Sequence, residues 1–207
     1  MFYGGQEYRE IQIHDDNLRT HSVEGKVHAR VTGKAVVEAL KGSIVDAYDN
    51  VRVIARAGST VSCHGKSSVH AYGDALVNLY DESLGYANDE SNVAAFDQSI
   101  LYAADGSKIL AYDKACVQAT HKAKVGANDK SIVIAFGNVK VEAYDHASIR
   151  AAGGAEVTAH GKSWVRALKS CSVEAEESAL SEAFDTAVVD QRGSIVTIAF
   201  PGEHVPT

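Results

Sequence analysis

Residue types that carry out chemistry in proteins recur in this chain at regular intervals. His64 and His160 both stand in the tetrapeptide HGKS, and nine aspartates occupy the same place in an eight-residue pattern. Repeated histidines could hold a metal ion or move protons, and repeated aspartates could hold calcium between the turns of a β-helix. Each of these activities needs several side chains that converge on one point.

The spacing of these residues does not predict such convergence. Calcium takes about six to eight oxygen ligands, whereas this sequence offers one Asp per octad and often replaces it with Gly, so we interpret Asp as a turn residue. No set of His, Cys and carboxylate residues has the spacing of a zinc site. Neither HGKS nor GGAE has the full G-x-x-x-x-G-K-S/T pattern of a phosphate loop. We therefore expect no catalytic residue, no metal and no cofactor.

The eight-residue pattern runs through most of the chain. With Val141 as position a, the octad a to h holds from about Ala29 to Phe200 without an insertion or deletion. Position a is Val, Ile or Leu at 17 of 20 places, c is Ala at 17 of 20, and e is Asp or Gly at 15 of 19. Positions g, a and c alternate with h, b and d, which is typical of a strand with one buried face. Asp and Gly tolerate a left-handed backbone, so positions e and f are expected to form a corner.

Stacking of these octads predicts an all-β fold, a parallel β-helix or β-solenoid. A helix does not match a period of eight, and a β-meander would leave long open edges. We expect three octads, or about 24 residues, per coil and about eight coils, because Val and Ala on three sides can fill a small triangular core. The alternative is a flattened coil of two octads. The three-octad coil separates His64 from His160 by four coils, roughly 19 Å.

The predicted organisation has three parts. Residues 1–28 are expected to form an N-terminal cap and an irregular first coil, residues 29–200 the octad solenoid, and residues 201–207 a C-terminal tail or cap. The three cysteines are far apart, which fits a reducing compartment. No apolar run is long enough to span a membrane and no secretory signal is visible, so we expect a cytoplasmic protein without membrane contact.

The phrase V-x-A-Y-D-x-A-x, which stands in the sequence as VEAYDHAS from Val141, resembles the octad repeats of small β-solenoid proteins of bacteria, phages and other mobile elements. The resemblance covers nearly the whole repeat body. It implies the solenoid fold and a mobile-element setting, but it implies no particular activity. The left-handed β-helix acyltransferases differ, because their repeat has a period of six.

Charge lies in bands along the chain, whose net charge is -7. Residues 67–107 contain seven acids and no Lys or Arg, residues 108–169 contain ten bases and five acids, and residues 170–191 contain six acids and no base. These bands are either ordinary solvated surface or docking sites for a protein partner with a basic surface. The negative net charge disfavours direct binding of nucleic acid.

Aromatic residues at position d point outward next to a corner. They are either a stacking ladder between coils or a binding surface, and Trp164 at position h is the largest outward anchor. Together with the acidic bands they give the candidate partner-binding residues Tyr72, Tyr80, Asp81, Glu82, Asp89, Glu90, Trp164, Glu174, Glu176, Glu177 and Glu182.

We therefore expect a non-enzymatic interaction protein. In the setting that the resemblance implies, it would dock on and inhibit a nucleic-acid-handling host complex, such as a CRISPR or other defence system. The octad body has no inserted loop, which leaves little from which to build a pocket. The alternatives are a self-assembling structural protein of a phage appendage or filament, which would be a homo-oligomer, and an enzyme with a site between subunits.

Overall fold

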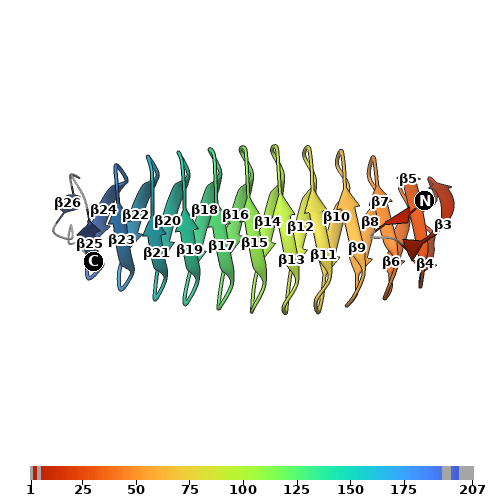
Figure 1. Cartoon of the computed structure of the whole chain (residues 1–207), viewed down its shortest axis with the longest axis horizontal. Helices are drawn as coiled ribbons and strands as arrows, with labels where there is room; N and C mark the ends of the chain where they lie inside the picture. The colour runs from red at the N-terminus through yellow and green to blue at the C-terminus, as the bar shows by residue number, and fades with distance from the viewer. Residues whose placement is uncertain (1, 4–5, 193–196, 201–207) are drawn as a thin grey trace, which may run out of the picture.

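The computed structural model describes residues 2–3, 6–192 and 197–200, which form an elongated stack of β-strand coils (Figure 1). The predicted all-β parallel β-solenoid is confirmed: two sheets of twelve parallel strands face each other in the described part of the chain. The segment 201–207, for which we expect a tail or cap, lies outside the described residues.

Successive strands alternate between the two sheets, which we call the odd sheet and the even sheet after the strand numbers. A short antiparallel pair, β1 (Phe2–Tyr3) and β2 (Gln6–Glu7), precedes them. The odd sheet contains β3 (Arg9–Asp15), β5 (Val27–Gly33), β7 (Ile44–Ala47), β9 (Thr60–Cys63), β11 (Leu76–Leu79), β13 (Asn92–Ala95), β15 (Lys108–Ala111), β17 (Lys124–Ala127), β19 (Lys140–Ala143), β21 (Glu156–Ala159), β23 (Ser172–Glu176) and β25 (Val188–Arg192). The even sheet contains β4 (Thr20–Val23), β6 (Val36–Ala39), β8 (Arg52–Ala55), β10 (Ser68–Ala71), β12 (Leu84–Ala87), β14 (Ile100–Ala103), β16 (Cys116–Ala119), β18 (Ile132–Phe136), β20 (Ser148–Ala152), β22 (Trp164–Leu168), β24 (Leu180–Phe184) and β26 (Thr197–Phe200).

Each coil consists of two octads, so the expected coil of three octads and the expected count of about eight coils are wrong. The register shows this directly, since Val45 pairs with Val61 and Leu79 pairs with both Cys63 and Ala95. One odd strand and one even strand complete a coil. Two facing sheets can pack tightly when position a carries a Val-sized side chain and positions g and c carry small ones. A triangular coil would need larger side chains to fill its centre.

The alternation of buried and outward positions follows the octad pattern. Val45, Ala47 and Val51, at positions a, c and g, are fully buried, while the residues between them contact solvent. Corners occur where Asp and Gly were expected: Asp49 has a φ of 60° and Gly65 has a φ of 65°. The aspartates therefore serve as turn residues, as predicted from their exchange with Gly.

Two kinds of corner result from this coil. We call the turn after an odd strand an odd corner and the turn after an even strand an even corner. They lie on opposite long edges of the solenoid, where the strands give way to the loops drawn at its two margins (Figure 1). Residues that are 16 positions apart therefore form rows along one corner or one sheet.

Candidate protein-binding surfaces

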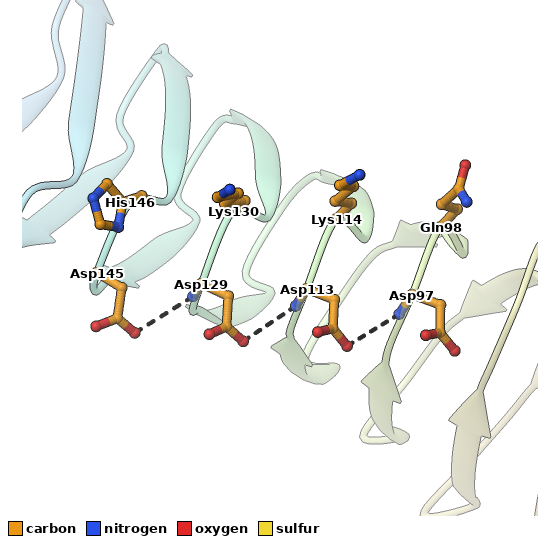
Figure 2. A pocket seen from close by; sticks show the side chains of 8 residues that line it. All are labelled: Asp97, Gln98, Asp113, Lys114, Asp129, Lys130, Asp145 and His146. Carbon is orange, nitrogen blue, oxygen red and sulfur yellow. Dashed lines mark hydrogen bonds between the residues drawn. The ribbon is translucent and has the colours of Figure 1, made fainter.

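The odd corners carry a chain of carboxylates that runs along the solenoid edge (Figure 2). The backbone N–H of Asp81 donates to the Oδ2 atom of Asp97 at 3.0 Å, and the N–H groups of Asp97 and Asp113 donate to Asp113 and Asp129 at 3.4 and 3.2 Å. The chain continues from Asp129 to Asp145 at 3.5 Å. Each carboxylate thus connects its own coil to the preceding one and is held in a fixed direction.

The residue after each of these aspartates points to the other side of the corner. Gln98, Lys114, Lys130 and His146 line, with the aspartates, a shallow groove of about 600 Å³ (Figure 2). Within the described residues, neither Lys114 nor Lys130 forms a salt bridge. Lys114 and Lys130 offset the negative charge of the aspartates in two coils. One coil before Gln98, the equivalent position of the odd corner is occupied by Glu82.

The first acidic band, residues 67–107, occupies both edges of the solenoid. Asp81 and Glu82 lie at an odd corner, while Asp89 and Glu90 lie at the next even corner. The carboxylates of Asp81 and Asp89 accept the N–H groups of residues 65 and 73 at 2.9 and 3.0 Å. Glu82 lies 3.7 Å from the exposed amine of Lys66, a contact that contributes little to stability. All four carboxylates remain exposed to a partner.

The second acidic band, residues 170–191, does not form one surface. Glu174 pairs with Arg192 at 2.7 Å and Glu176 pairs with His160 at 2.9 Å, both on the side of the odd sheet. Glu177 accepts the N–H of Gly161 at 3.0 Å at an odd corner, and Glu182 belongs to the even sheet. The sequence pattern did not reveal these partners, because each lies about one coil away along the chain.

Five aromatic or imidazole rings stack along the odd sheet. His64 lies between Tyr48 and Tyr80, with ring centroids 4.8 Å apart on each side, and the stack continues from Tyr80 through Phe96 to Tyr112 at 5.1 Å per step. His160 stacks on Tyr144 in the same column. The histidines are therefore ladder members. They stand six coils apart, roughly 29 Å at the strand spacing, instead of the four expected.

The coil of two octads separates the outward aromatics into two groups. Tyr80 belongs to the ladder of the odd sheet, whereas Tyr72 and Trp164 lie on the side of the even sheet, where the guanidinium of Arg56 is 5.3 Å from the Tyr72 ring centroid. The predicted candidates thus lie on both sheets and both edges, and the structure does not gather them into one site.

A second ladder on the even sheet escaped the sequence prediction. His70, Tyr86 and Tyr102 stack with centroids 4.4 and 5.3 Å apart. Beside it, Ile100 and Ile132 are 44% and 47% exposed, so that the rings and the aliphatic side chains form one partly apolar patch. These residues occupy positions b and h of alternate octads, so a count made over single octads dilutes their pattern. A comparison of every second octad would have found it.

The nucleophilic side chains of the chain are mostly inaccessible. The hydroxyl-bearing residues at position g, such as Ser67 and Ser83, are fully buried between the sheets. Burial raises the pKa of Cys63 to about 12 and also raises the pKa of Cys171, so both thiols stay protonated near neutral pH. Among the described residues no three His, Cys, Asp or Glu side chains gather as a metal site.

No protein-family profile, curated protein or solved structure matches the chain. Within its described residues there is no helix long and apolar enough to cross a membrane.

Proposed function

We propose that this chain is a non-enzymatic docking protein whose first acidic band binds a basic surface on a protein partner. The observation that carries the proposal is the density of carboxylates at the corners that flank β10, β12 and β14. Residues 67–107 place seven acids and no Lys or Arg on about 2.5 coils, or about 12 Å of the solenoid axis.

The charge density of this band is close to that of a nucleic-acid duplex. Seven charges in about 12 Å correspond to one charge per roughly 1.7 Å, and duplex DNA also carries one charge per roughly 1.7 Å of its axis. A protein surface that binds a few phosphates of a duplex would therefore meet a similar field on this solenoid. This supports a partner that handles nucleic acid.

Several carboxylates of the first acidic band are also held rigidly. The backbone N–H groups that hold Asp81, Asp89 and Asp97 fix the direction of their carboxylates before any partner arrives. A preorganised charge row loses less conformational entropy on binding than flexible side chains do. Together with the resemblance to mobile-element solenoids, this favours a role as an inhibitor that occupies the nucleic-acid site of a host defence complex.

The experiment that tests this proposal captures partners on the immobilised chain and challenges the complex with a short duplex DNA. We expect the captured partner to be released by the duplex and by high salt.

The double variant Glu90→Lys/Asp105→Lys should lose the partner, because it reverses two exposed charges at the even corners of the band. Neither side chain makes a hydrogen bond or salt bridge within the described residues, so the fold should be kept. Asp105 has a left-handed backbone with a φ of 54°, and Lys169 shows that a lysine is accepted at such a corner, with a φ of 59°.

A control of equal charge change is available on the odd sheet. Glu142→Lys/Glu156→Lys alters the net charge by the same amount at exposed sites among lysines, away from the first acidic band. This variant should keep the partner. The proposal is wrong if both variants lose the partner equally, or if the complex withstands both the duplex and high salt.

A further inference from the structure

The middle of the even sheet presents an uncharged, partly apolar face. The outward side chains of β10, β12, β14, β16 and β18 include no Asp, Glu, Lys or Arg. Leu84, Ile100, Cys116 and Ile132 form one row across these strands, and the His70–Tyr86–Tyr102 ladder forms the next. Because Ile100, Tyr102 and Ile132 are each more than 40% exposed, this face is costly to leave in water.

The odd sheet differs in the same coils. Its strands β15, β17 and β19 place Lys108, Lys124 and Lys140 in one row, with each lysine paired in register to the next. A like-charged row resists contact with a copy of itself. Of the two sheets, the even sheet is therefore the one that can meet a second copy without repulsion between equal charges on its face.

We infer that two copies of this chain associate through their even sheets in an antiparallel arrangement. The charges at the corners decide the direction. The corners beside β10, β12 and β14 carry seven acids and one base, Lys66, whereas those beside β16 to β22 carry five lysines, Lys114, Lys122, Lys130, Lys162 and Lys169, and three acids, Asp113, Asp129 and Asp145. A parallel pair would place the acidic region over itself, whereas an antiparallel pair places it over the region with the excess of lysines.

The outward arginines indicate the register. Arg150 on β20 forms no hydrogen bond or salt bridge within the described residues. Arg166 on β22 lies 4.7 Å from the Phe184 ring centroid, and its Nε atom is buried without a hydrogen-bond partner. A two-fold axis that runs along the strand direction between β16 and β18 brings Arg150 over Tyr102 of the second copy and Arg166 over Tyr86. Because His70 and Tyr102 cover the two faces of the Tyr86 ring, the guanidinium groups meet the ring edges and can donate hydrogen bonds to the phenolic oxygens.

The same axis places further groups opposite suitable partners. Trp164 lies opposite Leu84 and Glu182 opposite His70 on the faces, and Lys162 lies opposite Glu82 at the odd corners. Facing sheets pack about 10 Å apart, with their strands close to aligned. The complementarity thus extends over the eight even strands from β10 to β24.

The same axis places three kinds of equal charges opposite each other at the odd corners: Lys114 and Lys130, Asp113 and Asp129, and Asp97 and Asp145. Lys114 and Lys130 lie at the odd corners before β16 and β18, so the axis places each opposite the other. Asp113 and Asp129 precede them at the same corners and offset their charge. All three kinds of pair lie at the exposed rim, where water and salt screen the repulsion.

The area of this face determines how tightly the two copies are expected to bind each other. Eight strands span roughly 38 Å and the outward rows at positions h, b and d span about 13 Å, giving a contact of roughly 500 Å² on each copy. Stable interfaces of standard size bury about 800 Å² per partner. We therefore expect a dimer that dissociates on dilution.

Sedimentation velocity over a wide concentration range tests this inference. The wild-type chain should pass from monomer to dimer as concentration rises. Ile132→Lys, at the centre of the face, should raise the dissociation constant roughly tenfold or more, and Ile100→Lys should act in the same direction. Leu110→Lys is the matched control, because Leu110 projects from the odd sheet with 49% exposure, close to the 47% of Ile132. It should leave the dimer unchanged.

A charge exchange tests the direction of the two copies. Glu82→Lys and Lys162→Glu should each weaken the dimer, and the double variant should restore it, because the antiparallel pair brings these residues together. Cys116, which is partly exposed on β16, gives a second readout. Its reaction with a thiol reagent should slow at high concentration in the wild type but not in Ile132→Lys.

The inference fails if the wild type stays monomeric at every concentration, if Ile132→Lys and Leu110→Lys behave alike, or if the double charge exchange gives no recovery. It does not rest on the proposed function. Ile132→Lys leaves the acidic corners unchanged, so partner capture by this variant separates a failure of the dimer from a failure of the docking proposal.

Discussion

The side chain of Leu79 on β11 fills the space that Gly85 on β12 leaves in the facing sheet. A Cβ atom on Gly85 would lie 2.6 Å from Cδ1 of Leu79 and 2.9 Å from Cδ1 of Leu101. Leu79 stands at a position where the repeat has Ala, and Gly85 stands where the repeat has Val. The two departures from the pattern therefore compensate each other within one coil.

This pair predicts strong coupling between two substitutions. Gly85→Ala should destabilise the fold by about 1–3 kcal/mol through overpacking, and Leu79→Ala by about 2–5 kcal/mol through a cavity. The double variant should cost clearly less than the sum, because the smaller side chain makes room for the added Cβ. Urea unfolding of the four proteins measures the coupling. Additivity within about 0.5 kcal/mol would contradict the compensation.

The ring ladder of the odd sheet predicts a local role for His64. Replacing it with Ala removes stacking on both Tyr48 and Tyr80, at about 0.5–1.5 kcal/mol for each pair, while His64→Phe should retain most of this energy. Hydrogen exchange of the amides in β7, β9 and β11 measures the effect. His146→Ala at an exposed corner is the control and should leave these amides unchanged. Equal protection in His64→Ala would show that the ring contacts contribute nothing.

The corner residue Asp97 combines a left-handed backbone with a hydrogen bond to the previous coil. Its φ is 56°, and its carboxylate accepts the N–H of Asp81. Asp97→Asn should cost least. Asp97→Gly should lose only the hydrogen bond, about 0.5–1.5 kcal/mol, and Asp97→Ala should lose the bond and also strain the backbone by about 1–2 kcal/mol. Thermal unfolding ranks the three variants. An Ala variant as stable as the Asn variant would refute this account of the corner.

The first coil is predicted to loosen in acid. The N–H of Asn17 donates to Asp15 at 2.6 Å and His21 contacts its other oxygen at 3.0 Å, and these bonds hold the pKa of Asp15 below its usual value of 3.8. A carboxyl with a lowered pKa in the folded state stabilises the fold fully above its usual pKa, and this contribution is lost as the pH falls through the lowered value.

Amide exchange in β3 and β4 measures this loss. Protection should fall below pH 3.8 in the wild type, and Asp15→Asn should lower protection at neutral pH and flatten its dependence on acid. Asp16→Asn, which changes an exposed carboxylate next to it, is the control. A wild-type profile that matches that of Asp15→Asn would show that the carboxylate has no such role.

The octad pattern predicts several local features correctly from the chain alone. The buried positions g, a and c, the parallel strands, and the corners at Asp and Gly all follow from side-chain size and backbone freedom within one octad. The turn role of residues such as Asp97 also follows, since their exchange with Gly reflects a local backbone preference. The separation of His64 from His160 is likewise enough to exclude a shared site.

The number of octads per coil is decided only when coils pack on each other. Coils of two and of three octads both fit the uninterrupted eight-residue pattern, and the prediction of three octads depended on the filling of a triangular core by Val and Ala. The packing of two sheets face to face determines the number of octads per coil. That number in turn determines which residues become neighbours. The stack of Tyr48 on His64 and the hydrogen bond from Asp81 to Asp97 each join residues one coil apart. The rows on the uncharged face of the even sheet also join residues one coil apart. Local pattern determines which side chains point inward, whereas the closure of the coil determines which outward side chains share a surface, because that depends on how tightly the core can pack.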